Sequence, residues 1–301
     1  MPDISLQERA RARRLLVKSG GKKERPHAIM FQNFYTEGQE TKLDPAFVPH
    51  DGTRNARTDH REVALFLRLY HSGQYKAADY TGIVSPKFGE RTRITGTAFL
   101  DFVARNPGYD VYFINSYPSN AYYSFNVWEH GEIHHPGLMT LAQYLFDCAG
   151  LGWDVFHMGR NSRATLLYCN YWLGNERFWD RFIDLNLRLL RAAESLPPRA
   201  RARLLALDPD YPDPVPMLPF VLERLFSTLL LMEPAIRGCA FPHSRQYIMT
   251  SDINGPDERG IAASFLDVVD EIDRRGEYNE RDMALFRSLQ HLKRRLNKRV
   301  I

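Results

Sequence analysis

The sequence has little cysteine and no long apolar run. Its three cysteines are too few and too scattered for a disulfide framework or a zinc knuckle, and they fit a reduced, cytoplasmic setting. No stretch approaches the roughly 20 apolar residues that span a bilayer, and the first residues are charged rather than apolar. We therefore expect neither a transmembrane helix nor a signal peptide.

Several common signatures of α/β enzymes are also missing. No G-x-G-x-x-G follows a predicted strand, and neither G-x-x-x-x-G-K-[ST] nor G-x-S-x-G occurs. These absences exclude a Rossmann dinucleotide site, a phosphate-binding P-loop and the nucleophile elbow of α/β hydrolases.

What the sequence does contain is an alternation of strand and helix patterns. Strands that alternate with helices imply crossover connections and a mainly parallel sheet covered on both faces, so we expect the α/β class. In the strand 109–114, Asp110 stands where an acid is locally disfavoured. The other predicted strands are 27–34, 79–85 and 165–173. The predicted helices are 58–73, 97–108, 137–149 and one that begins at Asn175. Asp59 and Glu62 would form a capping box at the start of the first helix.

The chain divides into one main domain with two additions. We expect a basic arm over 1–25, a folded domain over 26–233 and a helical extension over 234–301, with a turn at Gly276. Seven prolines in 195–219 leave room for little regular structure beyond one short helical segment. The apolar run that follows, through residue 233, predicts a single buried helix.

The net charge of +4 is modest, but both ends of the chain are basic. Such ends can contact an anionic surface, which leaves open a peripheral contact with an inner membrane, although solvated helix faces are the commoner explanation. A nucleic-acid partner is not expected, because the middle of the chain is close to neutral.

Ligands of open α/β sheets bind beyond the carboxyl ends of the strands. Lys87 and Arg91 follow the strand 79–85, and Asn170 lies in the predicted strand 165–173. Lysine and arginine side chains can neutralise phosphates, and a buried amide needs hydrogen-bond partners. Solvated surface charge is the alternative for the two basic residues.

The segment 126–138, "NVWEHGEIHHPGL", concentrates titratable side chains. His130 and His134 are four apart, but Gly131 and Pro136 make a stable helix doubtful, and the order differs from the zinc motif H-E-x-x-H. A loop of solvated histidines is one interpretation. The other is a pocket-lining loop in which Glu129, Glu132, His134 or His135 acts as a base or binds a ligand.

Three further charged residues stand in apolar surroundings. Asp110 either ends a turn or holds a divalent cation, although no Asp-x-Asp pair occurs in its region. Glu223 and Arg224 lie inside an apolar helix, where a buried charge costs several kcal/mol unless it is paired. A structural ion pair and a role in a pocket both explain them.

The order of these motifs resembles bacterial glycosyltransferases of the GT-A type that build capsule, exopolysaccharide and lipopolysaccharide. The resemblance covers about residues 27–233, and it rests on the order and spacing of five stretches rather than on one strong motif. They are "DYTGIVSPKF", "NPGYDVYFINSYP", "NVWEHGEIHHPGL", "LLYCNYWLGNERFWDRFI" and "PFVLERLFSTLL".

The resemblance implies a GT-A-like, Rossmann-like sheet, a nucleotide-sugar donor and a saccharide or lipid-linked acceptor. Lys87 and Arg91 would lie on the diphosphate side. Because the usual Asp-x-Asp is missing near Asp110, dependence on Mg²⁺ or Mn²⁺ is in doubt, and either Arg224 or the basic loop would replace the cation. An inverting transfer needs a base, for which Glu132 is the first candidate and His134 or Glu223 the next. A non-catalytic protein that binds sugars or nucleotides on the same scaffold is the alternative.

Overall fold

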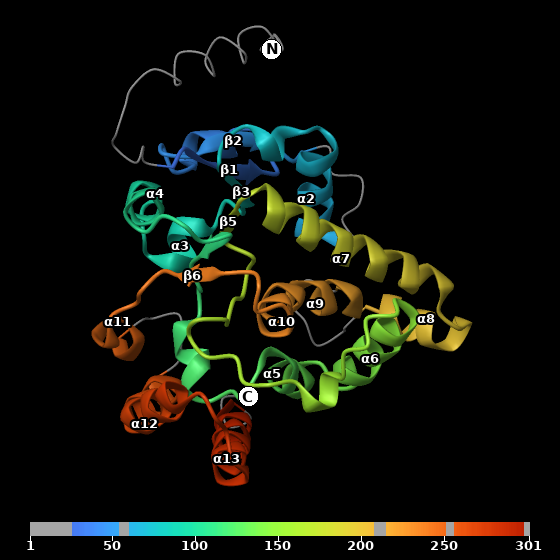
Figure 1. The fold of residues 1–301 in the computed structure, drawn as a ribbon, viewed down its shortest axis with the longest axis vertical. Helices are drawn as coiled ribbons and strands as arrows, with labels where there is room; N and C mark the ends of the chain where they lie inside the picture. Colours follow the sequence, from blue (N-terminus) through green and yellow to red (C-terminus); the bar gives the residue numbers. More distant parts are fainter. Residues whose placement is uncertain (1–25, 54–59, 208–214, 251–255, 298–301) are drawn as a thin grey trace, which may run out of the picture.

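The computed structural model describes residues 26–53, 60–207, 215–250 and 256–297 (Figure 1). An α/β fold with a mixed, mostly parallel sheet, flanking helices and a helical C-terminal part confirms the predicted class. The basic arm expected at 1–25 lies outside the described residues.

Six strands form the sheet in the order β2-β1-β3-β5-β4-β6. β1 is parallel to β2 and β3, and β4 is parallel to β6. β5 runs antiparallel to both of its neighbours, β3 and β4. The strands are β1 Ala28–Phe34, β2 Val48–Asp51, β3 Tyr80–Val84, β4 Val111–Phe113, β5 Trp172–Gly174 and β6 Gly238–Ala240.

Helices cover the sheet and form the C-terminal part. Among the described residues, no helix is both long enough and apolar enough to cross a bilayer. The helices are α2 Glu62–His71, α3 Phe88–Thr92, α4 Gly96–Arg105, α5 Val127–His134, α6 Leu138–Cys148, α7 Glu176–Ser195, α8 Pro198–Leu205, α9 Met217–Glu223, α10 Leu225–Met232, α11 Arg245–Thr250, α12 Pro256–Arg275 and α13 Glu280–Asn297.

The central strands alternate their side chains between two apolar cores. Trp172 packs with α2 and α7 on one face, stacking on Phe66 with ring centroids 4.9 Å apart. Its neighbours Tyr171 and Leu173 join the core that α3 and α4 close on the other face. Both faces of the sheet are therefore buried, as the apolar strand sequences predict.

The two edge strands are absent from the sequence prediction. β2 contains Pro49, which cannot donate to a strand ladder and is tolerated because β2 is an edge strand. β6 has only three residues and falls in the stretch expected to be wholly helical. The sheet thus continues past residue 233, where the sequence placed the end of the main domain.

The strand predicted at 165–173 is wrong in length. The backbone of Cys169 and Asn170 is left-handed, with φ of 68° and 51°, which no strand residue can adopt. β5 therefore begins only at Trp172.

Two helix predictions are also wrong. The capping box predicted for Asp59 and Glu62 is absent: Glu62 is the first residue of α2 and Arg61 is its N-cap, whereas a capping box needs the acid at the third helical position. Asp59 lies outside the described residues. The single helix expected through residue 233 is two helices, α9 and α10, divided at Arg224.

A buried arginine joins the C-terminal helices to the main domain. The Arg160 guanidinium is fully buried and pairs with Asp273 of α12, with Nε 2.8 Å from Oδ1. It also donates to the carbonyls of Ala121, Ser124 and Phe125, and it lies 4.0 Å from the ring centroid of Phe286 of α13. One side chain thus holds the two last helices to the turn before α5.

The Arg160→Ala variant should lose about 3–5 kcal/mol of unfolding free energy, because it leaves the partly buried Asp273 carboxylate and three carbonyls without their donor. Urea denaturation measures this loss. The control is Arg274→Ala, which removes an exposed ion pair with Glu271 and should cost less than about 1 kcal/mol. Equal losses in the two variants would contradict the role given to Arg160.

Candidate functional site

The candidate site lies at the carboxyl edge of the sheet. Because β5 is antiparallel, the turn that precedes it meets the ends of β3 and β4 at this edge. The Tyr171 carbonyl accepts from the Ile114 N–H at 3.0 Å, and its hydroxyl lies 2.7 Å from Ser85 Oγ. Residues that follow two parallel strands are thereby joined to the Cys169–Asn170 turn.

This turn holds two successive residues other than glycine in the left-handed region. Each such residue costs of order 1–3 kcal/mol, and strain of this kind concentrates at functional sites. Asn170 is buried, and its Oδ1 has no hydrogen-bond partner among the described residues. Ser116 Oγ, just beyond β4, is likewise buried without a described partner. Both atoms could hydrogen-bond a ligand at this edge.

Charged groups of both signs surround Cys169. Its N–H donates to Glu223 Oε1 at 2.9 Å, and Arg91 Nη1 donates to its sulfur at 3.2 Å and to the Tyr117 hydroxyl at 2.9 Å. Burial and, to a smaller extent, the charge of Glu223 raise the pKa of the Cys169 thiol to about 12, so the thiol stays protonated near neutral pH. The turn is a scaffold for charged neighbours rather than a nucleophile.

A second carboxylate, Glu62, belongs to the same group. Burial raises the pKa of Glu62, the negative charge of Glu223 raises it further, and Arg91 opposes this shift. Glu62 also acts on the pKa of Cys169. Two carboxylates and one arginine thus act on a single turn, and one carboxylate is held closer to neutral pH, which suits proton transfer.

His243 lies at the same edge, beyond the end of β6. Its Nε2 donates to the Asn115 carbonyl at 2.9 Å, and its ring stacks on Tyr247 with centroids 4.9 Å apart. Burial lowers the pKa of His243 to about 4, with a smaller contribution from Arg163. The ring is therefore neutral near pH 7 and holds the chain after β4 in place.

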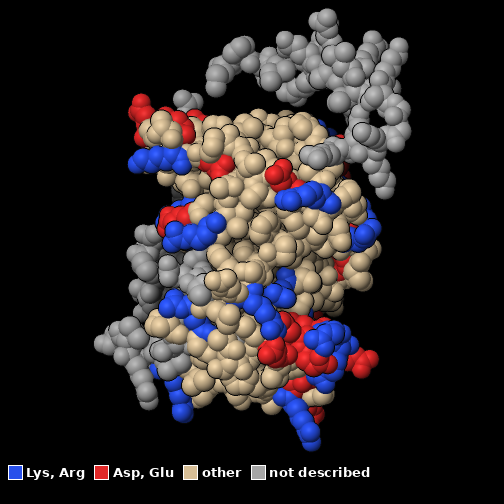
Figure 2. Space-filling view, turned by 90° about the vertical axis from the view of Figure 1, so that its left-hand side faces the viewer, with Lys and Arg blue, Asp and Glu red and all other residues tan. Residues whose placement is uncertain are grey.

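Figure 2 shows the side of the molecule that lies at the left in Figure 1. Lysine and arginine side chains are scattered over a mostly uncharged surface, and near its lower end they stand next to acidic side chains. Arg245 of α11 pairs with Asp267 and Asp270 of α12. Nucleic-acid recognition favours a continuous basic surface, and the described residues on this face form none.

Of the residues predicted from sequence, Arg91, Asn170 and Glu223 meet at the Cys169–Asn170 turn. Lys87 is exposed and precedes α3, on the same segment as Arg91. The predictions for these residues therefore agree in location, although they came from distant parts of the chain.

The segment 126–138 is not the expected loop, because residues 127–134 form the helix α5. Asn126 caps it by accepting from the N–H groups of Trp128 and Glu129. Gly131 is tolerated because it makes room for Arg224: a Cβ there would lie 2.4 Å from Arg224 Nε. His130 and His134 share one face as their spacing requires, with ring centroids 4.7 Å apart.

The acids of α5 have structural partners. Glu132 accepts from the N–H groups of Gly137 at 2.7 Å and Met139 at 2.8 Å, so both its oxygens cap α6. Glu129 lies 3.8 Å from Arg287 of α13, and burial raises its pKa. These contacts place Glu132, the first candidate for the base, in a structural position.

The two other candidates from this segment lie at the end of α5. His134 is exposed at the end of α5. His135 is buried and stacks on Phe220, with ring centroids 3.7 Å apart.

Arg224 and Asp110 both have structural partners. Arg224 is buried, and its Nε donates to the Val127 carbonyl at 2.9 Å, which ties α5 to the break between α9 and α10. Asp110 precedes β4, at the opposite edge of the sheet from the turn. Its carboxylate accepts from the Arg237 N–H at 2.9 Å and from Asn175 Nδ2 at 3.0 Å.

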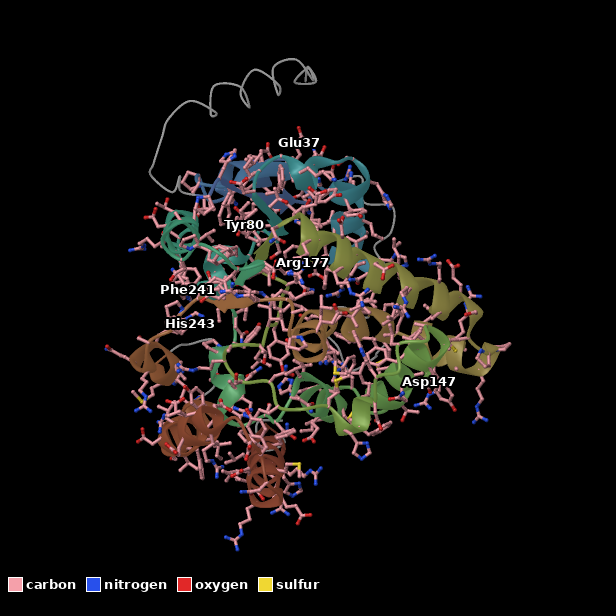
Figure 3. The ribbon with its side chains drawn as sticks, viewed as in Figure 1. Glu37, Tyr80, Asp147, Arg177, Phe241 and His243 are labelled. Carbon is pink, nitrogen blue, oxygen red and sulfur yellow. The ribbon has the colours of Figure 1, made fainter. Side chains whose placement is uncertain are left out.

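Arg177 forms an ion pair with Asp110. In Figure 3, Arg177 lies well to the right of Phe241 and His243, the residues that follow the carboxyl end of β6. Asp110 therefore does not fit a metal ligand at the site, since its oxygens already close the amino end of β4. In the described part of the chain, no three His, Cys, Asp or Glu residues are grouped as a metal would require.

Sequence reasoning missed Glu62 and His243 because it missed the strands before them. Had β2 and β6 been recognised, both residues would have followed the carboxyl end of a strand, which is the signal that selected Lys87 and Arg91. A scan of protein-family models, a search of curated proteins and a search of solved structures each found no match to this chain.

The Gly131→Ala variant should lose about 1–3 kcal/mol of unfolding free energy, because its Cβ meets the buried Arg224 guanidinium. Gly260→Ala in α12 is the matched control. Nothing lies near the Cβ that it would add, so it should be neutral or gain up to about 1 kcal/mol. Thermal unfolding of both variants measures the difference, and an unchanged Gly131→Ala variant would refute this packing.

Acid should destabilise the protein partly through His243. Its pKa is about 4 in the folded chain against 6.5 ordinarily, so the unfolded chain takes up the proton first and stability falls as the pH drops from about 6.5 to 4. The His243→Gln variant should lose less stability over this range in urea titrations. The control is His157→Gln, since the His157 side chain is 84% exposed. If the unfolding free energy of His243→Gln fell with pH as steeply as that of the parent chain, His243 would not contribute to acid destabilisation.

Proposed function

We propose that the chain is a glycosyltransferase that moves a sugar from a nucleotide-sugar donor to a saccharide or lipid-linked acceptor in surface-polysaccharide synthesis. The observation that carries this proposal is the meeting of Glu223 and Arg91 at the strained Cys169–Asn170 turn, at the carboxyl edge of the sheet. The charge of Glu62 also raises the pKa of Cys169. The resemblance of the ordered motifs to GT-A enzymes supports the same conclusion.

The reaction asks for two kinds of group, and the site has both. The acceptor oxygen attacks the anomeric carbon, the bond from that carbon to the diphosphate breaks, and the diphosphate leaves with the electron pair. Arg91 and Lys87 supply positive charge for the leaving phosphates. A carboxylate takes the acceptor proton, and Glu62 is suited to this because its raised pKa lies closer to neutrality.

The remaining groups suit recognition of the substrate. Glu223 is engaged through one oxygen by the Cys169 N–H, which fixes a second carboxylate beside the base. Asn170 Oδ1 and Ser116 Oγ are available to hydroxyl groups of a sugar or nucleotide. A requirement for Mg²⁺ or Mn²⁺ stays a prediction, and no step above depends on it.

The experiment is a panel of nucleotides and nucleotide sugars, each tested for thermal stabilisation with Mg²⁺, with Mn²⁺ and with EDTA. A donor at 100 times its Kd should add ~2.7 kcal/mol of stability. Turnover is then measured with the donor that binds. The Glu62→Gln variant should lower kcat by ~10²–10⁴-fold, the usual contribution of a base, while donor binding persists.

The variants separate the competing assignments. Glu280→Gln, an exposed acid of α13, is the control for removal of one negative charge and should turn over normally. Glu132→Gln tests the base predicted from sequence. Donor binding without turnover in the parent chain would favour the non-catalytic binding protein, and no binding of any nucleotide would overturn both.

A further inference from the structure

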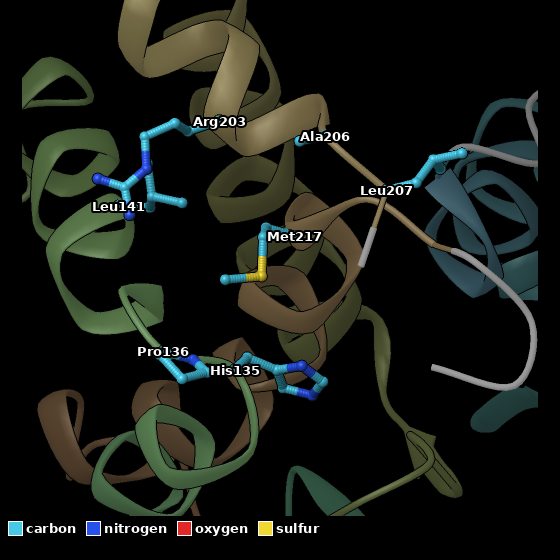
Figure 4. Close-up of a pocket in the computed structure, with 7 residues that line it drawn as sticks. All are labelled: His135, Pro136, Leu141, Arg203, Ala206, Leu207 and Met217. Atoms are coloured by element: carbon cyan, nitrogen blue, oxygen red, sulfur yellow. The ribbon is translucent and has the colours of Figure 1, made fainter. Parts of the chain in front are cut away.

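A second group of polar side chains lies at the carboxyl ends of β1 and β2. It is distinct from the pocket of about 230 Å³ between the α5–α6 turn and α8 (Figure 4), which is mostly apolar and whose lining residues hold no buried polar atom without a partner. At the end of β1, the Asn33 side chain is fully buried, and its Nδ2 has no hydrogen-bond partner among the described residues. Such a donor can hydrogen-bond a ligand that reaches it.

Asn33 faces the side of the sheet that α2 covers. Side chains alternate along a strand, and Phe31, on the same face of β1, shares its core with Val63 of α2. His50 of β2 lies on this face too, because its ring meets Phe31 edge to face and its Nδ1 is 3.0 Å from Asn33 Oδ1. Asn33 therefore points toward the start of α2, where Glu62 precedes Val63.

A glycine makes room for the Asn33 amide. A Cβ at Gly52 would lie 2.2 Å from Asn33 Nδ2 and 2.4 Å from its Oδ1, so a larger residue would displace the amide. The Gly52 N–H donates to the Phe34 carbonyl at 2.9 Å and holds the chain after β2 against the end of β1. Since the amide oxygen is the atom that meets His50, the Nδ2 protons stay available.

Tyr35 and Glu62 complete this group, and we call Asn33, Tyr35 and Glu62 the β1–α2 site. Tyr35 follows the last residue of β1 and is 43% exposed, so a ligand can reach its ring. Burial and, to a smaller extent, the charge of Glu62 raise the pKa of the Tyr35 hydroxyl, while the Asn33 side chain and Arg61 oppose the shift. The hydroxyl thus lies near both other members of the site.

The backbone is strained where α2 begins. Arg61, the N-cap, has a φ of 45° and a ψ of −125°, which residues other than glycine rarely adopt. Strain of this kind persists only where the surrounding structure holds it, and it concentrates at functional sites. This conformation leads directly into Glu62 and so determines where its carboxylate lies.

We propose that the β1–α2 site binds the acceptor of the sugar transfer, and that the receiving group is a saccharide hydroxyl rather than the phosphate of a lipid. A pyranose ring has an apolar C–H face that packs on an aromatic ring, and its hydroxyl groups need both donors and acceptors. The site offers the Tyr35 ring, the Asn33 donor and the Glu62 carboxylate. This inference rests on the proposed function, in which Glu62 takes the acceptor proton.

Charge favours a neutral ligand at the β1–α2 site. The carboxylate of Glu62 belongs to it, and the charge of Glu223 acts on Glu62, so a phosphate bound here would meet like charges. Arg61 and Arg91 offset part of this charge. A saccharide hydroxyl is neutral and avoids the repulsion, whereas the donor diphosphate would lie with Lys87 and Arg91 after β3.

The first test measures binding of methyl glycosides of glucose, galactose and mannose to the full chain by saturation-transfer NMR, without donor. We expect at least one glycoside to bind, and Tyr35→Ala to weaken its binding about tenfold, because the ring and the hydroxyl are both lost. Tyr35→Phe keeps the ring and should lose less. Asn33→Asp replaces the Nδ2 donor by an acceptor oxygen and should also weaken binding about tenfold. Circular dichroism checks that each variant is folded.

The matched control is Tyr144→Ala, which removes another exposed tyrosine, from α6, and should bind the glycoside as the parent chain does. No binding of any methyl glycoside would overturn the inference. Equal losses in Tyr35→Ala and Tyr144→Ala, or none in Tyr35→Ala, would overturn it as well. This test needs no donor, so it separates failure of the β1–α2 site from failure of the proposed function, which the nucleotide panel reports.

The second test is turnover with a donor that binds. Tyr35→Ala should raise the KM for the methyl glycoside about tenfold and leave kcat and the donor Kd unchanged. A raised donor Kd in Tyr35→Ala would assign the site to the donor and overturn the inference. Turnover with farnesyl phosphate and with no glycoside would show a lipid phosphate as acceptor and would overturn it too.

Discussion

β5 runs against the direction of both its neighbours, and the candidate site depends on that reversal. In an all-parallel sheet, the residues before a strand lie at the amino edge, far from the ends of the other strands. Here the Cys169–Asn170 turn precedes β5 and still meets the residues that follow β3 and β4. The hydrogen bonds of Tyr171 fix this meeting, so a sheet reversal brings Glu223 and Arg91 to one turn.

The sequence predicted the central strands of the sheet but not its two edge strands, β2 and β6. Continuous apolar runs identified β1, β3 and β4, because strands buried on both faces leave such runs. β2 and β6 are short edge strands with a proline or three small residues, and nothing in their local pattern separates them from loops. The left-handed backbone at Cys169 and Asn170 was equally hidden, since neither residue is a glycine.

Charge alone did not show which residues lie at the candidate site. Asp110 and Arg224 were candidates because charged groups in apolar surroundings need an explanation, and Glu132 because it lies in a cluster of titratable side chains. All three make hydrogen bonds to the backbone. The fit of Arg224 against Gly131 joins residues far apart in the chain, so no local pattern could show it. Arg91, Asn170 and Glu223 lie together at the Cys169–Asn170 turn, although different signals selected them: Arg91 follows a strand, Asn170 is an amide that needs partners, and Glu223 is a charge in an apolar helix.

The place of β5 in the sheet also constrains how the protein folds. β3 and β4 pair with β5 rather than with each other, so the sheet cannot close until a segment some sixty residues beyond β4 has inserted between them. Contacts of such long sequence separation form slowly. A chain that has formed only β1, β2, β3 and its helices has no Cys169–Asn170 turn in place, so the candidate site is complete only after β5 has paired with both of its neighbours.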